Sequence, residues 1–234
     1  MNLTVLIPLF NEEESCRELV ERVCQTCSRI IDFEIIVVED GSTDGSFEEL
    51  RRLADEFKAL RVIKFKANAG KSAALHAGFL NSQGKVIITL DADLQNPPEE
   101  IPRFLAAIED ADAVFGLRSR RRETNSKKIA SRFANRFRSY LLDDSSKDSG
   151  CGFKAFKDYT VKDLPLFNGM HRFFPALLMM RGYQYRELEI DDHERKYGYS
   201  KFGNLGRTLP ALIDLLAVRW MKKRALEYKI EKEI

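Results

Sequence analysis

The chain has 234 residues, enough for one large domain or two small ones, and its 44% hydrophobic and 32% charged residues indicate a soluble protein with a sizeable core. The formal net charge of +2 is too small to indicate a nucleic-acid-binding protein by itself. No uncharged apolar stretch of about 18 residues is present, and the N-terminus lacks the basic region and cleavage site of a signal peptide, so we expect neither a membrane span nor secretion.

The first half of the chain alternates apolar strands with helical patterns. Each short β-branched run is followed by a segment with helical periodicity, an order typical of a mostly parallel sheet with helices on both faces. We therefore expect an α/β fold. The predicted strands are Leu3–Pro8, Phe33–Glu39, Val62–Phe65, Val86–Leu90 and Ala113–Leu117.

The alternation stops after the fifth strand. A basic run, Arg118–Arg138, leads into a predicted helix over residues 127–142, and the apolar stretch Met170–Met180 has a helix-like pattern. One more strand is expected at Tyr185–Ile190. The apolar segment Thr208–Met221, which is followed by three basic residues, predicts an amphipathic C-terminal helix.

Two carboxylates, Asp91 and Asp93, come directly after the fourth strand. In an extended segment this spacing sends both side chains to the same face, where they can share one hard divalent cation. Taken alone, the spacing fits a solvated acidic turn better. Ligands of parallel sheets bind beyond the carboxyl ends of the strands, however, and the loops Pro8–Glu12 and Glu39–Gly45 follow strands of the same sheet. This clustering favours a metal site.

The basic run Arg118–Arg138 contains nine lysine and arginine residues and a single acid, Glu123. Such a local field attracts anions, and the phosphates of a substrate are one source of them. A solvated helix face and a nucleic-acid patch are the alternatives. Regularly spaced aromatic residues, which single-strand binding would use, are sparse in this run, so we expect no nucleic-acid partner.

A glycine-lysine-serine stretch, Gly70–Ser72, invites comparison with a P-loop, but the required glycine spacing is absent. Lys71 is therefore expected only to approach a phosphate or a sugar. His76 has no second histidine at ligand spacing and is interpreted as structural. His171 and His193 stand close to arginines in the sequence, and we do not expect either to form a catalytic pair with an acid.

A series of short motifs in a fixed order resembles family 2 glycosyltransferases. Within that family the chain is similar to the branch of dolichol-phosphate mannose synthases and polyprenyl-phosphate sugar transferases, over roughly residues 3–203. The motifs are VLIPLFNE at 5–12, EDGSTDG at 39–45, NAGK at 68–71, DADLQNPPE at 91–99, DSGCGFK at 148–154 and RKYGYSKF at 195–202.

The resemblance implies a GT-A fold, which is Rossmann-like, with a nucleotide-sugar donor, a divalent Mg²⁺ or Mn²⁺ ion and inversion at the anomeric carbon. Carried over to this chain, Asp40 is expected to contact the base, while Pro8, Phe10 and Glu12 shape the nucleoside pocket. The family commonly has two aspartates where this chain has Glu39 and then Asp40.

The resemblance also assigns the metal and phosphate sites. Asp91, Asp93 and Gln95 are the expected ligands of the metal and the diphosphate. Binding of the acceptor phosphate and donor is assigned to residues with phosphate-binding side chains, namely Arg118, Arg132, Arg195, Ser200 and Lys201, with Lys71 beside the donor. Of all these, Asp91, Asp93, Arg118 and Arg195 are the candidate catalytic residues.

The activity expected from the resemblance is transfer of a hexose, with mannose from GDP-mannose as the first choice, to a dolichyl or undecaprenyl phosphate. A lipid phosphate is already ionised, so it needs guanidinium groups to orient it but no strong general base. The alternatives are a UDP-sugar donor, another glycan or small-molecule acceptor, and, in a different class, a non-catalytic nucleotide- or RNA-binding module.

We expect one GT-A domain at residues 1–207, with a nucleotide-binding half at about 1–117 and an acceptor-binding half at about 118–207, followed by the helix and tail at 208–234. The basic, Trp-containing helix suits a membrane surface, and the alternatives are packing on the domain, in a homodimer or against a separate membrane subunit. Cys24 and Cys27 lack a second ligand pair for zinc and are expected to stay reduced. The expected location is cytoplasmic and peripheral on a membrane.

Overall fold

The computed structural model of the chain describes residues 2–118, 136–144, 146–162, 164–165, 167–191, 193, 196 and 208–226. Strands and helices alternate as far as β5, and the later elements are shorter. In chain order the elements are β1 (Leu3–Leu9), α1 (Glu13–Cys27), β2 (Phe33–Glu39), α2 (Ser46–Glu56), β3 (Leu60–Lys64), α3 (Lys71–Asn81), β4 (Val86–Thr89), the 3₁₀ helix η1 (Pro98–Glu100), α4 (Ile101–Ala107), β5 (Ala113–Arg118), β6 (Lys154–Lys157), η2 (Asp158–Thr160), η3 (Met170–Arg172), α6 (Phe174–Met180), β7 (Tyr185–Ile190) and α7 (Thr208–Lys223).

Within the described residues the strands form one seven-stranded sheet, in the order β3-β2-β1-β4-β6-β5-β7. Neighbouring strands are parallel except at β6, which runs antiparallel to β4 and to β5. The predicted α/β fold with a mostly parallel sheet is confirmed. The sequence pattern does not predict β6, because its four residues, KAFK, are too few to show an alternation and begin with a lysine.

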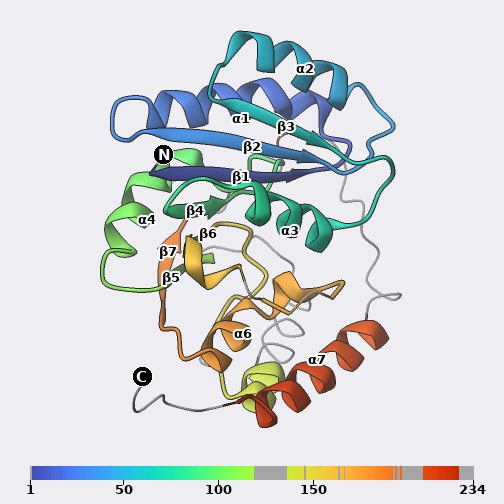
Figure 1. Cartoon of the computed structure of the whole chain (residues 1–234), viewed down its shortest axis with the longest axis vertical. Helices are drawn as coiled ribbons and strands as arrows, with labels where there is room; N and C mark the ends of the chain where they lie inside the picture. Colours follow the sequence, from blue (N-terminus) through green and yellow to red (C-terminus); the bar gives the residue numbers. More distant parts are fainter. Residues whose placement is uncertain are drawn as a thin grey trace, which may run out of the picture.

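Helices cover both faces of the sheet (Figure 1). One face carries α1, α2 and α4, and there Ile7 of β1 shares a core with Leu19 and Phe104. The other face carries α3, α6 and α7, and there Leu6 of β1 shares a second core with Phe174. Successive residues of β1 thus point into opposite cores, which is why this strand is apolar except for the buried Thr4 and does not alternate with polar residues.

The last described helix, α7, lies at the opposite end of the molecule from α2 (Figure 1). It buries Leu215 and Val218 in the second core. A salt bridge of 3.0 Å between Arg172 Nη2 and Asp214 Oδ2 also joins η3 to α7. One side of the predicted amphipathic helix is therefore a packing face of the domain.

One apolar segment differs from the prediction in detail. The stretch predicted as one helix over Met170–Met180 is divided into η3 and α6, with Phe173 between them. Residues 136–142 are helical as predicted, and the rest of the 127–142 prediction lies outside the described residues. None of the helices in the described ranges is both long enough and apolar enough to cross a membrane.

Candidate active site

Two loops at the carboxyl edge of the sheet are tied to each other. The loop after β1 holds Asn11 in the left-handed region, with φ of 54°. Its backbone N–H donates to Ser42 Oγ at 2.9 Å, and its side-chain Oδ1 accepts from the N–H of Thr43 at 2.7 Å. The expected meeting of these loops is therefore present. Parallel topology accounts for it, because β1 and β2 end side by side at Leu9 and Glu39.

The residues predicted to shape a nucleoside pocket lie along these loops. Pro8, Phe10 and Glu12 all have partly exposed side chains. The backbone N–H of Glu12 donates to Ser46 Oγ at 2.9 Å, which fixes the start of α1 against the start of α2. These three side chains therefore border the same edge of the sheet, where a ligand can reach them, and their contact with a base stays a prediction.

Asp40 is 3% exposed and is bound by the loop that leads into α3. Its Oδ1 accepts from the N–H of Ala69 at 2.7 Å, and its Oδ2 accepts from the N–H of Gly70 at 2.9 Å and from Asn68 Nδ2 at 3.1 Å. Burial raises the pKa of Asp40, and the two backbone hydrogen bonds oppose that rise. The carboxylate thus shapes the 68–70 loop, while the predicted contact with a base stays untested.

Asp91 pairs with Lys71 at the start of α3. The distance from Lys71 Nζ to Asp91 Oδ1 is 2.5 Å, and the two side chains are 34% and 31% exposed. Burial raises the pKa of Asp91, but the charge and hydrogen bond of Lys71, together with the charge of Lys154, outweigh it and lower that pKa. Asp91 is therefore an ionised carboxylate that already has a cationic partner.

Because Gly152 has no side chain, the Asp91 carboxylate can lie directly against its backbone. A Cβ added at Gly152 would lie 2.3 Å from Asp91 Cγ and 2.4 Å from its Oδ1. Contacts this short do not occur between non-bonded atoms. The glycine in the DSGCGFK motif therefore sets the position of Asp91 by close approach of the backbone.

The segment that carries Asp91 and Asp93 is a turn, so the assumption of an extended segment is wrong. Leu94 has φ of 59°, which reverses the chain directly after Asp93. Asp93 is 8% exposed, and its Oδ1 accepts from the N–H of Gln95 at 3.2 Å. Gln95 is also fixed from outside the turn, because its Nε2 donates to His193 O at 3.4 Å and its backbone O accepts from the N–H of His193 at 2.8 Å.

The chemistry of this turn fits a hard divalent ion. Asp91 and Asp93 offer carboxylate oxygens, and Gln95 carries an amide oxygen, the donor types that Mg²⁺ and Mn²⁺ prefer. No group of three or more His, Cys, Asp and Glu side chains that could hold a metal is present within the described ranges. Such an ion would therefore need further ligands, and diphosphate oxygens and water commonly supply them.

A second lysine near Asp91, Lys154, is buried. It belongs to the DSGCGFK motif, but no role for it is predicted from the sequence. Lys154 of β6 is 4% exposed and donates through Nζ to Cys151 O. Burial lowers the pKa of Lys154 to about 8. Because β6 lies beside β4 in the sheet, this charge acts on Asp91, two residues after the end of β4.

His171, for which no catalytic role is predicted, lies next to the same site. Its Nδ1 is 2.8 Å from Ser72 Oγ, and that hydroxyl also accepts from the N–H of Gly169 at 2.9 Å. Burial, followed by the positive charges of Lys71 and Lys154, holds the pKa of His171 well below its usual range. His171 is therefore a neutral imidazole at pH 7. Sequence spacing could not show this, because 99 residues separate it from Ser72.

Arg118, a candidate phosphate ligand, is engaged by an acid of the DSGCGFK motif. Its Nε and Nη2 donate to the two oxygens of Asp148 at 2.8 and 3.0 Å. The side chains are 20% and 5% exposed. The pair fixes the motif loop to the end of β5, and a contact of Arg118 with phosphate stays a prediction.

The other predicted phosphate ligands, Arg132, Arg195, Ser200 and Lys201, lie outside the described residues. One arginine of the basic run is internal. Arg138 is 8% exposed, pairs with Asp144 and donates to Ser146 O at 2.9 Å. This part of the run therefore stabilises the fold, and the interpretation of the whole run as an anion-binding surface does not hold at Arg138.

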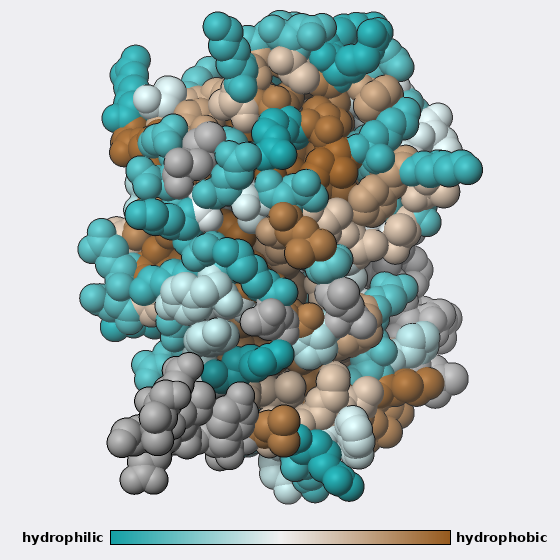
Figure 2. All heavy atoms as spheres, viewed as in Figure 1, coloured by the Kyte–Doolittle hydropathy of each residue, from teal (hydrophilic) through white to brown (hydrophobic). Residues whose placement is uncertain are grey.

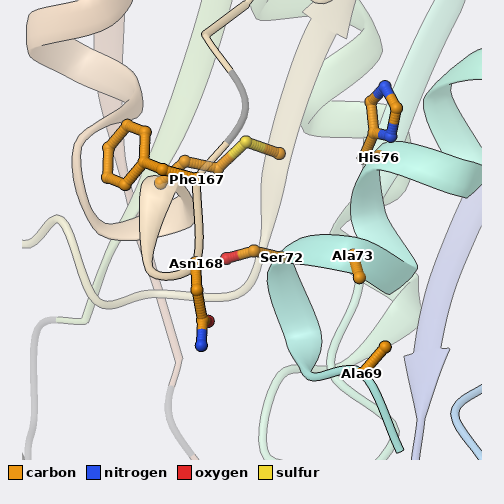
Figure 3. A pocket seen from close by; sticks show the side chains of 7 residues that line it. Ala69, Ser72, Ala73, His76, Phe167 and Asn168 are labelled. Carbon is orange, nitrogen blue, oxygen red and sulfur yellow. The ribbon is translucent and has the colours of Figure 1, made fainter. Parts of the chain in front are cut away.

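A cavity of about 270 Å³ opens between the first turns of α3 and the loop that precedes η3. Figure 3 shows Phe167 and Asn168 on one wall, with Ser72, Ala73 and His76 of α3 on the other. The walls combine apolar side chains with an amide, an imidazole and a hydroxyl. The lining residues are Ala69, Ser72, Ala73, His76, Phe167, Asn168 and Met170.

Comparison of the chain with protein families gives a match over residues 4–165 to the family described as glycosyl transferase family 2. Among curated proteins, it is 34% identical over 230 residues to a dodecaprenyl-phosphate galacturonate synthase of Rhizobium johnstonii, covering 95% of this chain and 68% of the relative. It is 37% identical over 218 residues to an undecaprenyl-phosphate 4-deoxy-4-formamido-L-arabinose transferase of Pectobacterium carotovorum, covering 92% and 66%. The chain thus spans about two thirds of the length of these relatives.

Among solved structures, the chain resembles glucosyl-3-phosphoglycerate synthase of Mycobacterium tuberculosis. The complex of that protein with Mn²⁺, UDP and phosphoglyceric acid has a TM-score of 0.70 at 18% identity and covers 93% of this chain and 78% of its own. Its complex with Mn²⁺, UDP-glucose and phosphoglyceric acid has a TM-score of 0.68 at 16% identity, covering 97% and 81%. The likeness confirms the expected GT-A type of fold.

Proposed function

Because the chain belongs to glycosyl transferase family 2, we propose that it transfers a sugar from a nucleotide sugar to a polyprenyl phosphate. The observation that carries the proposal is the Asp91–Asp93 turn, which lies at the same edge of the sheet as the loops after β1 and β2 and has two lysines beside Asp91. The acceptor follows from the relatives, since the two described above are named for transfer to dodecaprenyl and undecaprenyl phosphate.

The donor that the comparisons favour is a UDP-sugar. The solved structures with this fold contain UDP or UDP-glucose. The two relatives are named for galacturonate and for 4-deoxy-4-formamido-L-arabinose. The first expectation, mannose from GDP-mannose, has no support among these names, so the UDP-sugar alternative becomes the proposal.

The described residues suit this reaction through binding and orientation. A divalent ion held by Asp91, Asp93 and Gln95 would supply charge neutralisation for the diphosphate leaving group. The acceptor phosphate is itself an anionic nucleophile, so the absence of a strong general base from the described part of the site is consistent with the reaction. Lys71 and Lys154 add positive charge beside Asp91, where negative charge on the leaving group increases.

The cavity between α3 and residues 167–170 is the proposed site of the donor sugar. Its volume of about 270 Å³ is of the size of a single sugar ring with its hydroxyl groups. Phe167 and Met170 offer apolar contact to the ring, while His76 and Asn168 offer hydrogen bonds to hydroxyls. Ser72 lines this cavity, and the residue before it, Lys71, contacts Asp91. The cavity therefore lies close to the proposed metal site.

The exposed side of α7 is the proposed contact with the membrane that contains the acceptor. Its apolar side chains Leu212, Ile213, Leu216 and Trp220 are 44%, 59%, 54% and 62% exposed. Lys223 and Arg224 at the end of the helix suit anionic headgroups, while Lys222 donates to Leu142 O and to Asp143 O of the domain. Figure 2 shows brown, apolar side chains at this lower edge of the molecule. A dimer or further segments of a longer protein are the competing occupants.

A matrix of donors and acceptors tests the function. The protein is incubated with Mn²⁺ and UDP-glucuronate, UDP-galacturonate, UDP-glucose or GDP-mannose, each with and without undecaprenyl phosphate, and lipid-linked sugar is measured by mass spectrometry. We expect product from a UDP-sugar only when the lipid phosphate is present. Transfer that does not depend on the lipid would contradict the acceptor assignment, and product from GDP-mannose alone would contradict the donor.

The non-catalytic alternative makes a separate prediction. A nucleotide- or RNA-binding module would bind RNA in a salt-dependent way, and that binding would survive Asp91→Asn and Asp93→Asn. The proposed transferase loses transfer in both variants while its fold, measured by circular dichroism, stays intact. Electrophoretic mobility shift assays with RNA on wild type and on these two variants separate the two classes.

A further inference from the structure

The contact between Lys71 and Asp91 places a cation of the protein where the metal is expected. We propose that Lys71 is an internal counter-cation of Asp91 that the divalent ion must displace, so that ion and nucleotide bind cooperatively. This inference rests on the proposed function, and it adds a mechanism by which the site stays closed to the ion until the donor arrives.

The geometry makes the ammonium and the ion competitors. Lys71 Nζ lies 2.5 Å from Asp91 Oδ1. Mg²⁺ binds oxygen at about 2.1 Å, so an ion on the same oxygen would lie no more than about 4.6 Å from the ammonium group. Two cations at that distance repel each other strongly when they are only partly solvated. An ion that binds Oδ1 of Asp91 is therefore in direct competition with the Lys71 ammonium group.

Lys71 is able to move, and the other lysine of the site is not. The Lys71 side chain is 34% exposed and begins the first turn of α3, directly after a glycine. Lys154 is 4% exposed and holds Cys151 O from within the core. The displaced ammonium needs a new anion, and the diphosphate of the donor supplies one at the same edge of the sheet. Nucleotide and ion thus favour each other through Lys71.

Without nucleotide, the positive charge of the lysines beside Asp91 should make binding of the ion alone weak. Asp91 is one carboxylate, and both Lys71 and Lys154 act on it. Asp93 adds a second carboxylate, but Lys154 stays in place when Lys71 leaves. A doubly charged ion therefore enters a site that already holds compensating positive charge, unless a diphosphate adds its own negative charge.

Isothermal titration calorimetry with Mn²⁺ tests the inference on wild type, Lys71→Met and Lys85→Met, each with and without UDP. Lys85 is an exposed lysine directly before β4, so its variant makes the same charge change away from the candidate site. We expect UDP to raise the Mn²⁺ affinity of wild type about tenfold or more. Lys71→Met should bind Mn²⁺ alone about tenfold more tightly than wild type, with a smaller effect of UDP, and Lys85→Met should match wild type.

Each failure has its own signature. If Lys71→Met binds Mn²⁺ alone no more tightly than wild type, while wild type binds Mn²⁺ with UDP, Lys71 is not a competitor and the inference is overturned. If wild type binds neither UDP nor Mn²⁺ in any combination, the proposed function fails first and the inference falls with it. Lys71→Gln, which keeps a polar group at this position, repeats the test if Lys71→Met lowers the melting temperature.

Discussion

Replacing Gly152 by alanine should move Asp91 and leave most of the fold intact. The new Cβ would lie 2.3 Å from Asp91 Cγ, whereas ordinary contacts of a Cβ begin at 3.4 Å, so the carboxylate must retreat by about 1 Å. Asp91 can do so by rotating its short side chain, and we expect a loss of stability of about 1–2 kcal/mol. A displacement of about 1 Å in a positioned group costs on the order of 100-fold in rate.

The assay compares Gly152→Ala with Gly182→Ala. Gly182 has φ of 79° and no atom within 4 Å of an added Cβ, so its substitution strains the backbone at a distance from Asp91. We expect both variants to lose about 1 kcal/mol or more in urea denaturation, but only Gly152→Ala to lose transfer activity and Mn²⁺ affinity. Equal activity in the two variants would refute the claim that the backbone at Gly152 positions the Asp91 carboxylate.

Three further predictions concern the cavity, Lys154 and α7. Asn168→Ala should raise the KM for the donor about fivefold with kcat nearly unchanged, as one lost hydrogen bond to the sugar would do; an unchanged KM places the sugar elsewhere. The pKa of Lys154 falls from 10.5 to about 8 on folding, so the unfolded chain binds more protons between these values and the free energy of unfolding should rise with pH across this window. The free energy of unfolding of Lys154→Met, measured by urea denaturation across this pH window, should lack that part of the rise. Trp220→Ser should weaken binding to anionic vesicles about tenfold in a sedimentation assay, while Leu80→Ser, which changes a residue 61% exposed on α3, should not.

The position of the candidate site follows from features that the sequence shows. Apolar runs alternating with helical patterns predict parallel strands, and the polar loops Pro8–Glu12 and Glu39–Gly45 must then meet at one edge. The structure has this arrangement, with Asn11 bonded to Ser42. Asp91, two residues after β4, reaches the same edge. Topology alone therefore predicts where the candidate site lies.

The contacts within the site depend on features that residue types do not show. We expect an extended segment at Asp91 and Asp93 from the sequence, but the left-handed φ of Leu94 makes it a turn. His171 and Lys154 come from the later part of the chain, and their place beside Asp91 depends on η3 and on the short antiparallel strand β6. A pattern of hydrophobicity carries no signal for a neutral histidine or a buried lysine, because histidine is intermediate in burial and lysine is usually exposed.

A run of charged residues in the sequence does not show which of its side chains are exposed in the structure. Arg138 belongs to the basic run but is buried against Asp144, an acid six residues away. The C-terminal helix divides in the same way, since Val218 is buried while Trp220 is 62% exposed. In both cases the tertiary partner decides which side of a helix faces outward, and a single sequence does not name that partner.

Transfer to the lipid is tested most directly by whether consumption of undecaprenyl phosphate matches release of UDP, one for one, in the presence of Mn²⁺. Both are followed in the same reaction, by mass spectrometry of the lipid and by a coupled assay for UDP. We expect equal amounts for wild type and none for Asp93→Asn. Release of UDP without loss of the lipid phosphate would contradict transfer to the lipid, because the donor would then be hydrolysed instead of transferred.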